Sequence, residues 1–120
     1  MTTTALIVDD HPTFRRFARR LLEEAGLVVL GDAGDGASAL SAARELRPDV
    51  VLLDVLLPDT TGFDLARALA AEPDPPLVVL TSSRSAADLG DLAGRDGAAG
   101  FIPKCELSVA TLAAVVGGTA

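Results

Sequence analysis

Five short apolar runs alternate with segments of helical periodicity along the chain, and this alternation limits the fold more than any other feature. Each run is four or five residues long, and the run Val50–Leu53 is a continuous series of strand formers, which predicts a strand buried on both faces. Strict alternation of strands and helices requires a parallel sheet with helices on both faces, joined by right-handed crossovers. The runs are Ala5–Val8, Leu27–Leu30, Val50–Leu53, Leu77–Leu80 and Ala98–Ile102.

The helical segments carry apolar residues at three- and four-residue spacing. The first begins at Pro12, whose missing N–H costs nothing in a first helical turn, and ends at Gly26. The helical segment with the weakest pattern extends from about residue 85 to residue 93, and Gly90 and Gly94 each lower its helix propensity by about 1 kcal/mol. Residues 31–36 are interpreted as a turn-rich connection, with the wrong spacing for a dinucleotide-binding loop. Four arginines on the first helix are interpreted as its solvated face: Arg15, Arg16, Arg19 and Arg20.

The length and composition predict one soluble domain over residues 1–120, with no linker, repeat or second domain. Apolar residues make up 49% of the chain and aromatic residues 3%, so the core must be aliphatic. The net charge of −7 argues against a nucleic-acid-binding surface, which needs clustered Lys and Arg. The single cysteine, Cys105, excludes an internal disulfide and fits the cytoplasm. No signal peptide is visible, and no apolar run approaches the roughly 20 residues needed to cross a membrane.

Four of the five predicted strands are followed by polar side chains that could carry chemistry. Asp9 and Asp10 follow the first strand, Asp54 the third, Thr81 the fourth and Lys104 the fifth. In the common doubly wound order 2-1-3-4-5, strands 1, 3, 4 and 5 are neighbours, and ligands bind at their carboxyl ends. A lone Asp after a strand is usually a turn or capping residue, but this convergence favours Asp54 as a nucleophile or metal ligand. Lys104 is the only lysine beside nine arginines, which favours a specific role for a compact ammonium.

Three neighbouring carboxylates need a cation. At roughly 4 Å and an effective dielectric constant near 20, each pair repels by about 4 kcal/mol. Oxygen ligands suit Mg²⁺, whereas one Cys and one His cannot build a zinc site. Carboxylate, Mg²⁺, hydroxyl and lysine together predict phosphoryl transfer to Asp54, with Mg²⁺ and Lys104 neutralising the phosphoryl oxygens and Thr81 donating a hydrogen bond.

Four short motifs stand at the predicted strand ends: residues 6–12 (Leu-Ile-Val-Asp-Asp-His-Pro), residues 51–58 (Val-Leu-Leu-Asp-Val-Leu-Leu-Pro) with Gly62, residues 80–82 (Leu-Thr-Ser) and residues 100–104 (Gly-Phe-Ile-Pro-Lys). With these motifs the sequence resembles, over nearly its whole length, the receiver domain of bacterial two-component response regulators. The Asp-Asp-His-Pro start resembles the NarL/FixJ branch of that family, whose usual output is a DNA-binding helix-turn-helix. The resemblance implies a flavodoxin-like (βα)5 fold.

The resemblance also implies specific roles and partners. Asp54 would take a phosphoryl group from a histidine kinase or a small phosphodonor. Asp10, Asp54 and the backbone carbonyl of Leu56 would hold Mg²⁺, with Asp9 acting through water. Thr81 and Phe101 would form a switch pair that changes the face of the fourth helix, fifth strand and fifth helix. The sequence leaves open which downstream protein reads this face and whether the phosphorylated chain dimerises.

Other interpretations were weighed against these roles. Phe101 could simply fill the core, His11 is expected to start the first helix rather than to bind metal, and Cys105 is expected to have no role. A phosphorylation-independent interaction module or a phosphate sink of the same fold is the alternative function. An aspartate-based phosphatase would need an acid at the position of Leu56. We expect no turnover beyond Mg²⁺-dependent self-phosphorylation and autodephosphorylation, in a stand-alone receiver rather than an excised domain.

Overall fold

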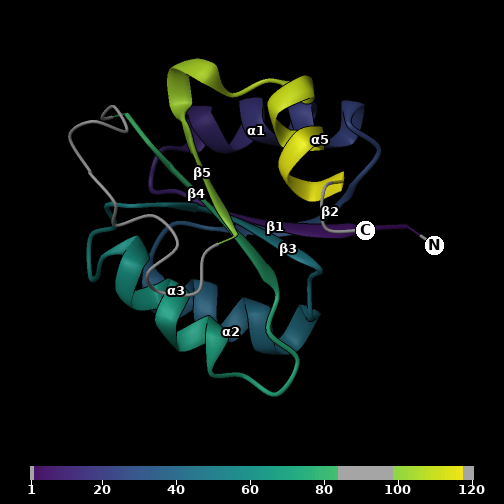
Figure 1. Cartoon of the computed structure of the whole chain (residues 1–120). Coiled ribbons are helices and arrows are strands. Elements are labelled where there is room, and N and C mark those ends of the chain that lie inside the picture. Colours follow the sequence, from purple (N-terminus) through teal and green to yellow (C-terminus); the bar gives the residue numbers. More distant parts are fainter. Residues whose placement is uncertain (1, 84–98, 118–120) are drawn as a thin grey trace.

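The computed structural model describes residues 2–83 and 99–117, which form a parallel sheet covered by helices (Figure 1). The strand order is β2-β1-β3-β4-β5, and every neighbouring pair is parallel. This is the doubly wound, flavodoxin-like order that the sequence predicted. The strands are β1 (Thr4–Val8), β2 (Val28–Ala33), β3 (Val50–Asp54), β4 (Leu77–Ser82) and β5 (Gly100–Pro103).

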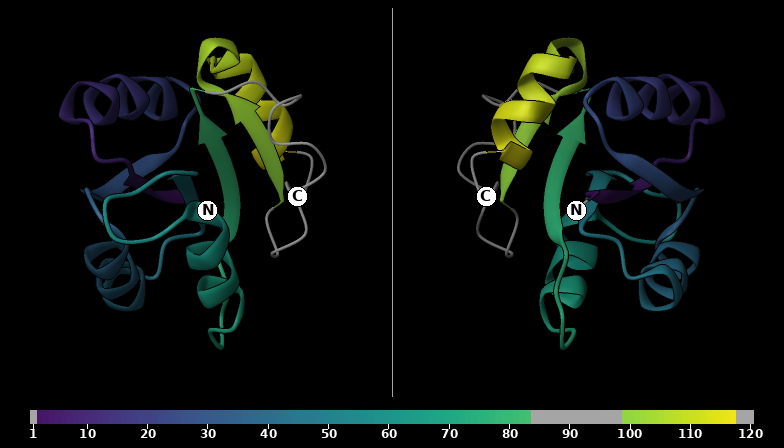
Figure 2. Two further views of the ribbon diagram at one scale, coloured as in Figure 1. Left: turned by 90° about the vertical axis from the view of Figure 1, so that its left-hand side faces the viewer. Right: turned by 90° about the vertical axis from the view of Figure 1, so that its right-hand side faces the viewer.

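Helices cover both faces of the sheet. Helices α1 (Pro12–Glu24) and α5 (Val109–Gly117) lie on one face, and α2 (Gly36–Leu46) and α3 (Gly62–Ala70) lie on the other, as the side views in Figure 2 show. A short 3-10 turn, η2 (Lys104–Glu106), follows β5. The helix predicted near residues 85–93 lies outside the described residues. Within the described part of the chain, no helix is long and apolar enough to cross a membrane.

Strand β3 lies at the centre of the core. All five of its residues are buried, and successive side chains point to opposite faces of the sheet. Val51 and Leu53 pack with α2 and α3, whereas Val50 and Leu52 pack with α1 and α5. The prediction of a strand buried on both faces is therefore confirmed.

The predicted ends of the other strands were less accurate. Strand β2 continues through Gly31, Asp32 and Ala33, which had been interpreted as a turn, because these residues pair with Leu6–Val8 of β1. Gly and Asp are poor strand formers, but backbone pairing with a buried neighbour outweighs that preference here. Likewise β4 continues through Ser82 and β5 ends at Pro103, since each keeps pairing along its neighbour.

Candidate functional site

The carboxyl ends of β1, β3, β4 and β5 bring the predicted site residues to one edge of the sheet. Asp54 lies opposite Thr81 in the β3–β4 register, and Ser82 lies opposite Pro103 in the β4–β5 register. Asp9, Asp54 and Thr81 are all buried, whereas Asp10 is exposed. Lys104 reaches this edge from η2, so the convergence predicted from the sequence is present.

The ammonium group of Lys104 lies between two carboxylates. Its Nζ atom is 2.7 Å from Asp9 Oδ2 and 3.6 Å from Asp54 Oδ2. The contact with Asp9 is an ion pair without the alignment of a hydrogen bond. The same Nζ lies 4.2 Å from the ring centroid of Phe14, a cation–π contact that helps to fix the ammonium. Phe14 was not among the site residues predicted from the sequence.

Ionisation of the Asp54 carboxyl group is less favourable at this site than in water. The pKa of Asp54 is raised from 3.8 to about 6, first by burial and then by the nearby carboxylate of Asp9, although Lys104 and the Leu56 N–H act to lower it. That N–H donates to Asp54 Oδ1 over 3.4 Å. Asp54 is thus mostly ionised at neutral pH, and an additional cation would relieve the electrostatic cost.

Four side chains at this edge have the spacing of a metal site. One ligand atom from each of Asp9, Asp10, His11 and Asp54 lies within 4.8 Å of the others. His11 is the N-cap of α1, as predicted, but its ring also lies beside the carboxylates, with Nδ1 3.1 Å from Asp9 Oδ1 and 3.0 Å from Asp10 Oδ1. That ring position was missed, because adjacency in sequence does not fix where a side chain points. A set rich in carboxylate oxygens is suited to a hard divalent cation.

The two residues of the predicted switch pair lie on neighbouring strands. The Thr81 hydroxyl is buried, and Oγ1 has no hydrogen-bond partner among the residues that the structure describes. Buried hydroxyls are nearly always paired, so this one is suited to a ligand that accepts a hydrogen bond. Phe101 lies opposite Leu80 and is partly buried against the core beside α2 and α3. This position suits both a core ring and a moving ring, so the switch role of Phe101 stays a prediction.

The loop between β3 and α3 passes tightly behind Asp54. The Gly62 N–H donates to the carbonyl of Val55 over 2.6 Å. A Cβ atom at Gly62 would lie 2.4 Å from the Asp54 carbonyl oxygen and 2.8 Å from the Val55 Cα. Only glycine allows this approach without displacing the backbone that carries Asp54.

The assignment of Arg15 to the solvated face of its helix was wrong. Its Nη1 atom donates to the Asp9 carbonyl over 2.5 Å, and its Nε lies 3.5 Å from Asp32 Oδ1. Helical spacing placed the guanidinium outside the core but could not show that the long side chain folds back. Arg15 therefore supports the backbone of the site between β1 and β2.

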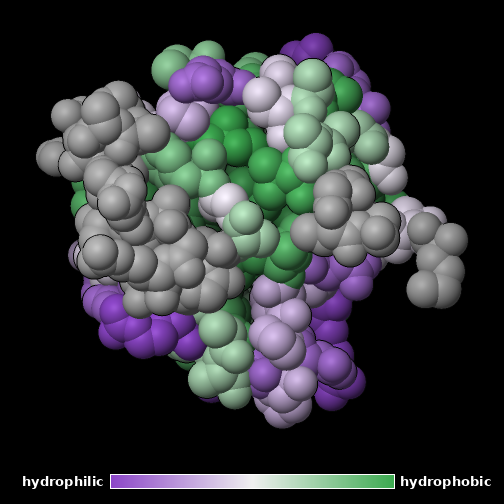
Figure 3. Space-filling view, in the orientation of Figure 1, coloured by the Kyte–Doolittle hydropathy of each residue, from purple (hydrophilic) through white to green (hydrophobic). Residues whose placement is uncertain are grey.

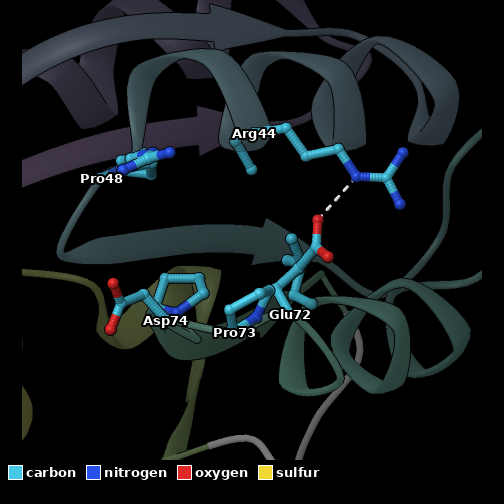
Figure 4. Close-up of a pocket in the computed structure, with 9 residues that line it drawn as sticks. Arg44, Pro48, Glu72, Pro73 and Asp74 are labelled. Carbon is cyan, nitrogen blue, oxygen red and sulfur yellow. Dashed lines mark hydrogen bonds and ion pairs between the residues drawn. The ribbon is translucent and has the colours of Figure 1, made fainter.

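A separate cavity of about 420 Å³ lies at the opposite edge of the sheet, where β3 and β4 begin (Figure 4). It is lined by the C-terminal parts of α2 and α3 and by the prolines that precede these two strands. An ion pair closes one side, with Arg44 Nε 2.6 Å from Glu72 Oε1. None of the predicted site residues lines this cavity, so it is distinct from the carboxylate site.

Residues 5–116 match the family described as response regulator receiver domain. The chain belongs to this family. It is 43% identical over 96 residues to the nitrate/nitrite response regulator protein NarP of Escherichia coli, covering 77% of this chain and 45% of that protein. It is 41% identical over 89 residues to the DNA-binding response regulator MtrA of Mycolicibacterium smegmatis, covering 74% of this chain and 39% of that protein. The chain thus spans less than half the length of these relatives.

The fold is also that of solved receiver domains. The NarL signal receiver domain from Mycobacterium tuberculosis superposes with a TM-score of 0.82 at 34% identity, covering 97% of this chain and 98% of that one. Both the NarP and the NarL similarity are consistent with the NarL/FixJ-like branch. The domain is a phosphoacceptor module of two-component systems, and its carboxylate cluster fits an acceptor site.

Proposed function

We propose that Asp54 is the phosphoacceptor. A carboxylate oxygen of Asp54 attacks phosphorus, the bond from phosphorus to the donor breaks, and the products are an aspartyl phosphate and the released donor. The observation that carries this assignment is the placement of Asp54 between a lysine and a hydroxyl. Lys104 Nζ lies 3.6 Å from Asp54 Oδ2, and Thr81 is the register partner of Asp54 on β4.

Lys104 and Thr81 act on the transferred phosphoryl group. The Lys104 ammonium is already held at the site by Asp9 and the Phe14 ring, so it can neutralise phosphoryl oxygens without reorganising. The Thr81 hydroxyl, which is buried and unpaired among the described residues, donates a hydrogen bond to one of these oxygens. Both groups favour the phosphorylated state over the free carboxylate.

The residues present fit a Mg²⁺ ion. Asp10, Asp54 and the backbone carbonyl of Leu56 would hold it, with Asp9 acting through water. The oxygen donors and the burial that raises the pKa of Asp54 both favour a divalent cation at this place. When bound, Mg²⁺ supplies positive charge to the phosphoryl oxygens.

The donor would be a histidine kinase in the cytoplasm, and the readout would be a change in the surface near β5. Movement of Thr81 toward the phosphoryl group would draw Phe101 inward and alter the face formed by the fourth helix, β5 and α5. Figure 3 shows hydrophobic residues gathered at the centre of the face that carries β4 and β5. Phe101, Val115 and Val116 are partly buried apolar residues of β5 and α5. The segment predicted to form the fourth helix lies outside the described residues.

Labelling with acetyl phosphate in Mg²⁺ tests this proposal. Intact-mass spectrometry should show one added phosphoryl group on the wild type and none on Asp54→Asn. Asp64→Asn is the matched control, because Asp64 is an exposed carboxylate of α3, and it should be labelled like the wild type. A folded wild-type chain that is never labelled would favour the phosphorylation-independent interaction module. A labelled chain whose surface does not change would favour the phosphate sink.

A further inference from the structure

We propose that Asp59 is a positioning residue, which ties the β3–α3 loop to the N-terminus of α2 and thereby holds the Leu56 carbonyl in place for the metal. This inference rests on the proposed function, because it takes Leu56 as a metal ligand. Asp59 lies outside the carboxylate cluster and was not singled out from the sequence.

The tie consists of two hydrogen bonds between segments that are far apart in sequence. Oδ1 of Asp59 accepts from the Gly36 N–H over 2.7 Å, and Oδ2 accepts from the Ala37 N–H over 3.1 Å. The first N–H groups of a helix have no partner within the helix and carry partial positive charge, so a carboxylate binds them well. The Gly36 N–H accordingly keeps the pKa of Asp59 below its usual value.

Helix α2 does not need Asp59 as its cap. Its N-cap is Asp35, whose Oδ1 accepts from the Ser38 N–H over 2.7 Å. The loop also packs directly on the first residue of the helix, since a Cβ atom at Gly36 would lie 2.4 Å from Thr60 Cγ2. The carboxylate of Asp59 therefore anchors the loop to a helix that is already capped.

The β3–α3 loop is a closed hairpin, so restraint of its turn also restrains Leu56. Leu56 and Thr61 form an antiparallel bridge, and the Leu57 N–H donates to the Thr60 carbonyl over 3.1 Å. Asp59 lies in the turn that this bond closes, and Leu56 lies at the base, two residues after Asp54. Fixing the turn against α2 thus limits how far the Leu56 carbonyl can move relative to Asp54.

The matched pair Asp59→Ala and Asp35→Ala tests the inference. Each variant removes one carboxylate that accepts from N–H groups of the first turn of α2, two of them in Asp59→Ala and one in Asp35→Ala, so both should lower the melting temperature. Mg²⁺ affinity, measured by isothermal titration calorimetry without phosphodonor, should separate them. The dissociation constant should rise about 10-fold in Asp59→Ala, as for other residues that orient metal ligands, and should stay at the wild-type value in Asp35→Ala.

Gly36→Ala is a second test, which perturbs the contact between α2 and the β3–α3 loop by changing the helix. Alanine favours the helix over glycine, so α2 is kept while the new methyl group displaces Thr60, and Mg²⁺ should bind more weakly. If both Asp59→Ala and Gly36→Ala bound Mg²⁺ with wild-type affinity, this inference would be overturned and the proposed metal site would stand. The same would follow if Asp35→Ala lost as much Mg²⁺ affinity as Asp59→Ala. Absence of Mg²⁺ binding to the wild type would overturn the proposed metal site as well.

Discussion

Replacing Asp54 by asparagine should stabilise the metal-free protein at pH 8. In the folded protein the pKa of Asp54 is about 6, against 3.8 in its ordinary state. At about 1.4 kcal/mol per pKa unit, ionised Asp54 therefore costs the fold ~3 kcal/mol. Asparagine loses the ion pair with Lys104, and water at the open edge of the sheet screens part of the cost. We therefore expect a gain of ~1–2 kcal/mol, or roughly 4–8 °C in melting temperature for a domain of this size.

The gain should depend on pH with a defined sign. The folded pKa of Asp54 lies above the unfolded value, so folding takes up a proton between pH 3.8 and about 6. As the pH falls through 6 toward 4, Asp54 becomes protonated in the folded wild type, so the free-energy cost of its ionisation is lost. The stability gained in Asp54→Asn should therefore shrink over the same range.

Thermal unfolding in EDTA, followed by circular dichroism at several pH values, measures this effect. Asp64→Asn removes the same charge from an exposed position of α3 and should change stability little. An Asp54→Asn variant that is no more stable than the wild type at pH 8, or whose advantage does not change with pH, would refute the account of Asp54 as a buried, repelled carboxylate.

Three further predictions concern the metal and the packing around the site. At Mg²⁺ concentrations of about 100 times the dissociation constant, the ion should stabilise the wild type by roughly 2.7 kcal/mol, and calorimetric melting should show that Asp10→Ala loses most of this gain. Gly62→Ala should destabilise the fold by about 1–3 kcal/mol in urea titrations, since its Cβ would meet the backbone of Asp54; a variant as stable as the wild type would contradict the close approach. Leu53→Ala should cost about 2–5 kcal/mol in the same titrations, whereas Leu56→Ala, at a position 54% exposed, should stay within ~0.5 kcal/mol.

The sheet and the convergence of the site could be predicted because both follow from local patterns. The continuous apolar run at residues 50–53 required a strand buried on two faces, and the parallel order then brought Asp54, Thr81 and Lys104 together. The end of β2 was missed because Gly31 and Asp32 carry a turn signal. Their strand conformation comes from pairing with β1, which is not visible in the local sequence.

The supporting contacts of the site could not be predicted for a related reason. Asp59 binds backbone groups 22 and 23 residues earlier, and Arg15 folds back onto the Asp9 carbonyl. Neither contact follows from residue type or periodicity, because each depends on how two separate segments are placed by the whole fold. Charged side chains with such roles look like ordinary surface residues in the sequence.

The most direct test of the central claim is to locate the phosphoryl group on the chain. After incubation with acetyl phosphate and Mg²⁺, borohydride reduction converts an aspartyl phosphate to homoserine, which peptide mass spectrometry can assign to a position. We predict homoserine at residue 54 and at no other aspartate. Homoserine at Asp9, Asp10 or any other aspartate, with residue 54 unchanged, would contradict Asp54 as the phosphoacceptor.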